Sequence, residues 1–241
     1  RDSDDPYFLY VASNAGSLLG LLAFPLLLER TLTSTGQLRA WSLGFAAYVL
    51  ALGACAIVVA RRGRTVAGGE IPPAGGRLAG GRPAGPGAAG SRPAAARIDP
   101  VRGARWVAVA ALPSSLMLGV TTYLTTDIAS VPFLWVPPLA LYLLSFMLTF
   151  GRRVRIGVGV ASAGAAATTI ALAVVEAGLL DLPTPWRLAL HLATLLAAAV
   201  LAHAWLYRDR PGTDHLTLFY LLLAIGGVVG GAFNALLAPV L

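Results

Sequence analysis

Few side chains in this sequence could do chemistry, and the most conspicuous is an acid between two apolar runs. Asp127 follows two threonines, Thr125 and Thr126, in the stretch TTYLTTDIASVPFLWVPP. A carboxylate beside a bilayer is costly, so it either lies at the water interface or binds a specific partner. The acid and the two hydroxyls next to it therefore predict a polar site that binds a cation or carries protons.

Other polar residues fall near the same ends of the apolar segments. Glu29 closes the first segment and Asn234 lies late in the last. Glu176 is near the end of the fifth segment, and His191 is just inside the start of the sixth. These residues either converge with Asp127 in one outward-facing cavity, or each reaches water independently at a helix end.

Asn14 lies deeper within the first apolar segment, and His203 lies near the far end of the sixth. A buried amide such as Asn14 bonds either a neighbouring helix or a substrate. His191 and His203 are the candidate ligands of a single haem or chlorophyll, because histidines within a membrane can ligate both. They are twelve positions apart, which is about 18 Å along a helix and about 120° around it, so they cannot share one metal.

No other cofactor is predicted, and no metal site. The sequence has no phosphate-binding loop, no metal-ligand spacing and no nucleophile elbow. Its single cysteine, Cys55, excludes an intrachain disulfide and a cysteine-based cluster. We therefore predict no catalytic residues in this chain.

The elements that must position these residues are membrane helices. Hydrophobic residues make up 57% of the 241 and charged residues 12%, against about 25% charged in soluble domains. Seven segments reach the roughly 20 apolar residues that a bilayer-spanning helix needs, and no alternating barrel strands are found. We predict an all-α integral membrane protein, a polytopic bundle of about seven transmembrane helices in the lipid bilayer. The segments lie near 7–28, 40–60, 106–126, 131–150, 156–180, 186–207 and 216–240.

The arginines predict the orientation. All 18 basic residues are arginines, and only Arg30, Arg39 and Arg187 fall on the side opposite to the other fifteen. Because basic loops stay inside, we predict a cytoplasmic amino terminus, an external carboxyl terminus and an external Asp127, in the bacterial cytoplasmic (inner) membrane. The arginines are not interleaved with aromatic residues, which argues against a nucleic-acid partner.

Three regions follow from this layout. Residues 1–60 hold two transmembrane helices, 61–105 form a flexible cytoplasmic linker rich in Gly, Pro and Arg, and 106–241 form a five-helix bundle. Trp106, Trp135, Trp186 and Tyr207 fall near segment ends, as in an aromatic belt. Small residues recur four apart, which favours close helix packing and protein partners through glycine-rich faces; they include Gly16 with Gly20, Gly226 with Gly230, and Gly227 with Gly231.

Several stretches carry a family resemblance. They are DPYFLY at 5–10 with SNAGSLL at 13–19, LGVTTYLTTDIA at 118–129, LWV at 134–136 with PLALYL at 138–143, HLT at 215–217 with Phe219 and Tyr220, and FNALLAP at 233–239. In these the chain resembles the membrane region of the bacterial fused major-facilitator/spermidine synthase-like family. Longer relatives have further amino-terminal spans, and some add a carboxyl-terminal synthase-like domain; neither is visible in this sequence. The start at Arg1, without a methionine, suggests a fragment or a processed product.

Two functions follow as hypotheses. The first is a transporter-type membrane protein that handles a small cation or polyamine at an outward-facing site of Asp127, Thr125, Thr126, Asn14, Asn234 and Glu29. The alternative is a non-catalytic transmembrane subunit that docks onto a larger membrane complex, or a membrane scaffold for a separate spermidine synthase-like domain.

Overall fold

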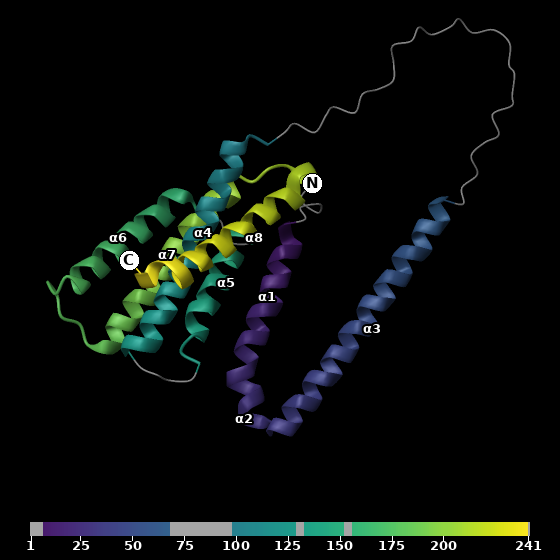
Figure 1. Cartoon of the computed structure of the whole chain (residues 1–241), viewed down its shortest axis with the longest axis horizontal. Coiled ribbons are helices and arrows are strands. Elements are labelled where there is room, and N and C mark those ends of the chain that lie inside the picture. The colour runs from purple at the N-terminus through teal and green to yellow at the C-terminus, as the bar shows by residue number, and fades with distance from the viewer. Residues whose placement is uncertain (1–6, 68–97, 129–132, 152–155, 241) are drawn as a thin grey trace, which may run out of the picture. The chain divides into compact units, whose positions relative to one another are not determined.

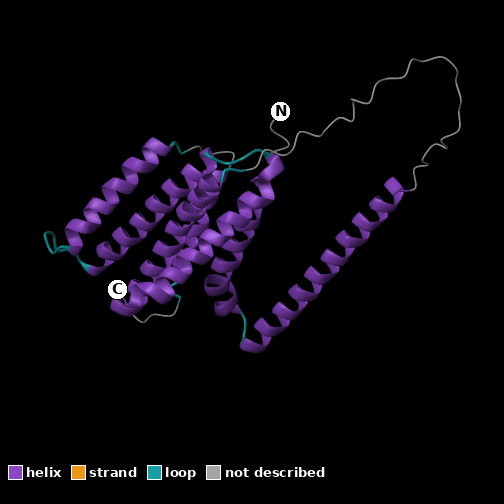
Figure 2. Ribbon diagram, turned by 45° about the horizontal axis from the view of Figure 1, so that its top comes forward, coloured by secondary structure: helices purple, strands orange, loops and turns teal. Residues whose placement is uncertain are grey.

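The computed structural model describes residues 7–67, 98–128, 133–151 and 156–240. Within these ranges the chain is helical, with short turns and no strand (Figure 2). The predicted all-α fold is therefore confirmed. The helices are α1 (Tyr7–Ala23), α2 (Glu29–Thr31), α3 (Ser34–Ala67), α4 (Pro100–Tyr123), α5 (Val136–Phe150), α6 (Val158–Glu176), α7 (Thr184–Arg208) and α8 (Leu216–Ala232) (Figure 1).

Six helical segments in the described ranges are long and apolar enough to cross a membrane, as expected of a multi-pass membrane protein. The seventh predicted span, 131–150, is instead the 15-residue helix α5, which begins only at Val136. At helical rise, α5 is about 22 Å long, shorter than the roughly 30 Å hydrocarbon core. Prolines 137 and 138 occupy its first turn, where a missing N–H costs nothing, and so fix where it begins.

Helices cover both ends of the predicted linker at 61–105. Helix α3 continues through the arginines to Ala67, because Arg and Ala both favour helix. Helix α4 begins at Pro100, where the Asp99 carboxylate accepts a hydrogen bond from the Val101 N–H at 3.1 Å. The rest of the predicted linker, 68–97, lies outside the described residues.

The chain divides into two compact units. Arg1–Leu26 and Ala95–Leu241 form the first, and Leu27–Ala94 forms the second. The second unit contains α2 and α3. Every described residue of α3 from 38 to 61 is exposed, including Trp41 and Phe45. An apolar helix surface of this length must be covered by lipid or by protein.

In the first unit, neighbours along the chain are not the closest neighbours in space. Helices α4 and α8 run parallel, since Gly103 lies against Leu222 near their first residues, and Ser114 donates to the Gly227 carbonyl further on. Helices α5 and α7 are also parallel, joined by Ser145 with His203.

Helix α6 runs antiparallel to α7, and α7 runs antiparallel to α4. Contacts of Glu176 with His191 and of Tyr123 with His191 give these directions at one end of the bundle. We call this end, which also holds Asp127, the outer end. The opposite end, which holds Arg102 and Arg208, is the inner end; the names follow the arginine prediction.

The core of this unit is aromatic and lies toward the inner end. Trp106 is fully buried with its ring edge-on to Phe219, the centroids 5.0 Å apart. Trp106 therefore belongs to the core rather than to the predicted aromatic belt. The other members of the buried cluster are Ala110, Phe146, Phe150, Leu206, Phe219 and Leu223.

Three helices end in a widened, π-helical turn. These turns are η1 (Phe24–Leu28) after α1, η2 (Leu124–Ile128) after α4, and η4 (Phe233–Leu237) after α8. The three helices run in the same direction, so all three π-helical turns lie at the outer end. Short π-helical turns are rare and recur at functional sites.

Candidate functional site

A polar pocket lies inside the first unit, among α1, α4, α5, α7 and α8. Its polar lining comes from Tyr10, Asn14, Tyr142 and His203, with Phe146 among the apolar walls. Its volume is about 110 Å³. Because a water molecule takes up about 30 Å³ of liquid, the pocket has room for three or four waters or one small polar group.

The tautomer of His203 can be assigned from the partners of the Ser145 hydroxyl. The Ser145 hydroxyl donates its only hydrogen to the Tyr142 carbonyl at 2.7 Å. Toward the His203 Nδ1, 3.0 Å away, this hydroxyl can then only accept. We therefore assign the ring hydrogen to Nδ1, which leaves Nε2 of this buried histidine as a hydrogen-bond acceptor.

The other polar lining groups also offer acceptors. Asn14 donates from Nδ2 to the Tyr10 carbonyl at 2.8 Å, so its Oδ1 remains to accept. Tyr10, Tyr142 and Phe146 add three aromatic rings to the lining, and the two phenol hydroxyls can accept as well as donate. Within the described residues no acid and no arginine lines this pocket. Its chemistry therefore favours a ligand that donates hydrogen bonds or presents a cation to aromatic faces.

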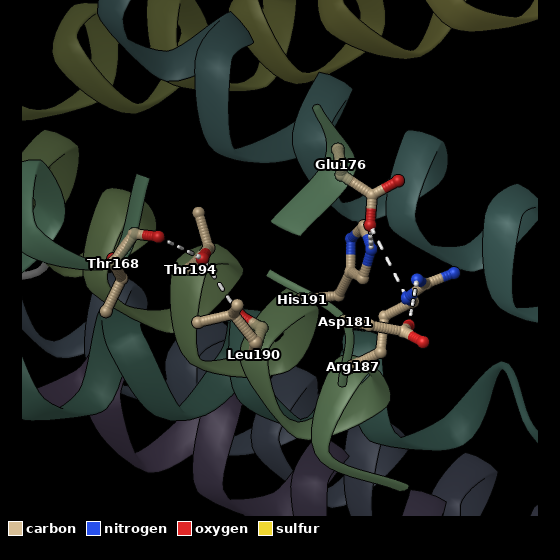
Figure 3. A network of polar contacts seen from close by, with 7 residues as sticks. All are labelled: Thr168, Glu176, Asp181, Arg187, Leu190, His191 and Thr194. Carbon is tan, nitrogen blue, oxygen red and sulfur yellow. Dashed lines mark hydrogen bonds and ion pairs between the residues drawn. The ribbon is translucent and has the colours of Figure 1, made fainter. Parts of the chain in front are cut away.

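A second polar group lies at the outer end, between α6 and α7 (Figure 3). His191 Nε2 is 3.3 Å from Glu176 Oε1, and the His191 ring packs on Tyr123 with centroids 4.3 Å apart. Arg187 lies between two carboxylates, 4.0 Å from Glu176 and 3.8 Å from Asp181. This network closes the α6–α7 turn and ties it to the end of α4.

Asp127 and its threonines are arranged more simply. Asp127 is exposed in η2, and its nearest polar partner is the Thr126 hydroxyl, 2.9 Å from Oδ2. Thr125 donates to the Thr121 carbonyl one turn earlier, at 2.9 Å. These side chains satisfy one another within a single helix end.

Asn234 and Glu29, predicted at the same site, are placed separately. Asn234 lies in η4, where its Nδ2 donates to the Ser115 carbonyl at 2.8 Å and also contacts the Ser115 hydroxyl, so it pins α8 to α4. Glu29 is exposed on α2 in the second unit. The structure thus brings Asn14 and His203 together at one pocket, and His191 and Glu176 at another place.

The space beside the two histidines does not fit a tetrapyrrole. The rings of Tyr142 and Phe146 lie 5.6 Å and 4.9 Å from the His203 ring, and the adjoining pocket is only about 110 Å³. His191 is held between Glu176 and the Tyr123 ring. A haem or chlorophyll would have to displace packed side chains at either position.

At the inner end, Asp209 joins α7 to α4. Its Oδ2 accepts from the Trp106 Nε1 at 2.7 Å, and its Oδ1 lies 3.1 Å from the Arg102 guanidinium. Arg102 also donates to the Asp209 backbone carbonyl at 2.6 Å. The buried indole N–H thus has its acceptor, which is why a tryptophan can occupy the core here.

No protein-family model, curated protein or solved structure matches the chain. The resemblance to the fused major-facilitator/spermidine synthase-like family stays a prediction from the stretches quoted above. The function of the pocket must therefore be inferred from its own chemistry.

Tyr10, Tyr142 and Ser145 were not predicted as site residues. Their signal was nevertheless present in the sequence as spacing. Tyr10 is four residues before Asn14, and Tyr142 is three before Ser145, so each pair lies on one face of its helix. Polar pairs with this spacing inside apolar segments mark a face that turns inward.

Proposed function

We propose that this chain is a transporter-type multi-pass membrane protein that binds a small organic cation with N–H donors, of ammonium or guanidinium type, in the pocket of Tyr10, Asn14, Tyr142 and His203. The observation that supports this most is a pocket between apolar helices whose polar lining includes several hydrogen-bond acceptors. Polar groups inside a membrane bundle are expensive and typically mark a substrate pathway.

No acid is found among the described lining residues, which suits a site that binds and releases a cation better than one that retains it. Aromatic faces and neutral acceptors offset part of the cost of removing a cation from water. They do so without a fixed ion pair, so the bound cation can also leave. At about 110 Å³ the pocket accepts one charged group of a polyamine rather than the whole molecule. Asp127, exposed at the outer end, would attract cations rather than hold them.

The test is uptake of radiolabelled guanidinium into proteoliposomes. Guanidinium is permanently charged and rich in N–H donors, whereas tetramethylammonium has the same charge and no donor. We expect guanidinium to be carried in preference to tetramethylammonium. Asn14→Leu removes one acceptor; since a hydrogen bond to a charged group is worth about 1.5–3 kcal/mol, apparent affinity should fall roughly 10- to 150-fold.

Ser162→Ala is the matched control, because Ser162 is exposed on α6 and bonds only its own helix at the Val158 carbonyl. Asp127→Asn should keep the affinity and slow uptake only at low salt. Wild-type uptake by a folded Asn14→Leu protein, or no uptake by the native chain above empty liposomes, would refute the proposal.

The apolar helix α3 favours a second candidate, a transmembrane subunit of a larger complex. Within the second unit, no residue of α3 from 38 to 61 is buried. A partner, including a separately encoded synthase-like domain with its own membrane anchor, would cover this helix. Purification in a mild detergent should then yield a stoichiometric complex, and a monodisperse single chain would count against this candidate.

A further inference from the structure

The turn that leads into α5 holds a strained residue. Phe133 has φ 68°, and within the described ranges it is the only residue other than glycine with positive φ. This left-handed region is unfavourable for a bulky side chain and persists only where surrounding contacts hold it. One such contact is the Val136 N–H, which donates to the Phe133 carbonyl at 2.9 Å.

The second contact is with α1. The Phe133 ring packs against that of Phe24, with centroids 6.1 Å apart and planes at 59°. Phe24 is the first residue of η1, where α1 widens into a π-helical turn. Two irregular backbone segments therefore meet through one aromatic pair at the outer end.

The helices joined by this pair are two walls of the pocket. Tyr10 and Asn14 come from α1, while Tyr142 and Phe146 come from α5. None of the described side chains of α1 is buried, whereas Ser145 and Phe146 of α5 are. Helix α1 is thus the less buried of these two walls, and at the pocket it is held by the Tyr10 ring, which contacts the rings of Phe146 and Tyr220.

We propose that Phe24 and Phe133 form an outer latch that holds α1 against α5 and closes the pocket, and that opening the latch admits the cation. The gating role rests on the proposed function above. The strain at Phe133 favours release, and the ring contact opposes it. The latch therefore has a closed and an open arrangement with opposing contributions to their free energies, which is what a gate requires.

Accessibility of the pocket tests the latch without any transport. Asn14→Cys, in a Cys55→Ala background, is labelled with a water-soluble maleimide in nanodiscs. Phe24→Ala and Phe133→Ala should each raise the labelling rate about 2- to 12-fold, the population shift that an aromatic pair of ordinary strength can hold. Phe45→Ala on α3, also a loss of an exposed ring, should leave the rate unchanged. Unchanged rates in both latch variants would overturn the proposal.

Reversible cross-linking tests the latch as a gate. A Phe24→Cys, Phe133→Cys pair closed with a cleavable bis-thiol reagent should reduce guanidinium uptake at least about tenfold, with recovery on reduction. The matched control, Leu118→Cys with Gly231→Cys, fixes α4 to α8 and should keep its uptake. Full uptake with the latch cross-linked would refute gating. Because labelling reports opening even where guanidinium is not carried, failure of the latch and failure of the transport proposal are separate results.

Discussion

The contact between α4 and α8 makes a quantitative prediction for Gly230→Ala. A Cβ at Gly230 would lie 3.0 Å from the Ser115 backbone nitrogen and closer still to the Ala111 carbonyl oxygen. Non-bonded heavy atoms prefer about 3.5–4.0 Å, so the helices would have to separate by roughly 0.5–1 Å or more. A Cβ at the adjacent residue, Gly231, would meet only the Leu118 side chain, at an ordinary 3.6 Å.

Separating the helices also stretches two hydrogen bonds between them. Ser114 donates to the Gly227 carbonyl at 3.0 Å, and Asn234 donates to the Ser115 carbonyl at 2.8 Å. Overpacking costs about 1–3 kcal/mol, and each interhelical bond in a membrane is worth about 0.6 kcal/mol. The helix-propensity gain of about 1 kcal/mol from Gly to Ala applies to both glycine variants and cancels between them.

We therefore expect Gly230→Ala to be less stable than Gly231→Ala by about 2–4 kcal/mol, or roughly 30- to 700-fold in the unfolding equilibrium. Unfolding by SDS in mixed micelles, followed by tryptophan fluorescence, measures this because Trp106 packs on α8 through Phe219. Equal midpoints for the two variants would show that α4 and α8 do not approach as closely as described.

Two further predictions concern the buried polar contacts. Asp209→Ala leaves the Trp106 N–H without its acceptor and should lower the free energy of unfolding by about 1–3 kcal/mol in the same assay. The control Asp214→Ala changes an exposed residue and should alter that free energy by less than about 0.5 kcal/mol. Equal effects of the two substitutions would contradict the contact between Asp209 and Trp106. Ser145→Ala removes the partner of His203 Nδ1, so ¹⁵N NMR of labelled histidine should change from a single Nδ1–H tautomer to a mixture. An unchanged tautomer would show that Ser145 does not set it.

Helix class and most helix limits could be predicted from the sequence because they depend on local chemistry. The length of the apolar segments identifies the spans. The start of α4 was predicted at 106, six residues too late, because the Asp99 cap and Pro100 at the first helical position were not recognised as a helix start. The start of α5 was missed by five residues. Apolar composition continues through 131–135, while the left-handed Phe133 and Pro137 determine where the helix can begin.

Which helices pack against one another could not be predicted, because the spacing of small residues is compatible with more than one packing face on the same helix. Gly226 with Gly230 and Gly227 with Gly231 offer two small-residue faces one position apart. Only the first is buried against α4, and the choice depends on the shape of α4. Some pocket residues were missed for the same reason, since they are recognised only once the packing of the helices is known. Asp127 was conspicuous by its charge, whereas Tyr142 looked like any other apolar-run residue until α5 and α7 were seen side by side.

The parallel pairing of α4 with α8 has a consequence for how the protein is made. More than 90 residues separate the end of α4 from the start of α8. At ribosomal rates of about 5–20 residues per second, α4 waits roughly 5–20 s in the bilayer before its main partner is synthesised. During that time the Ser114 hydroxyl and the Ser115 carbonyl lack their partners Gly227 and Asn234. Biogenesis, more than the mature fold, would then be sensitive to any change that slows synthesis or insertion of the last helix.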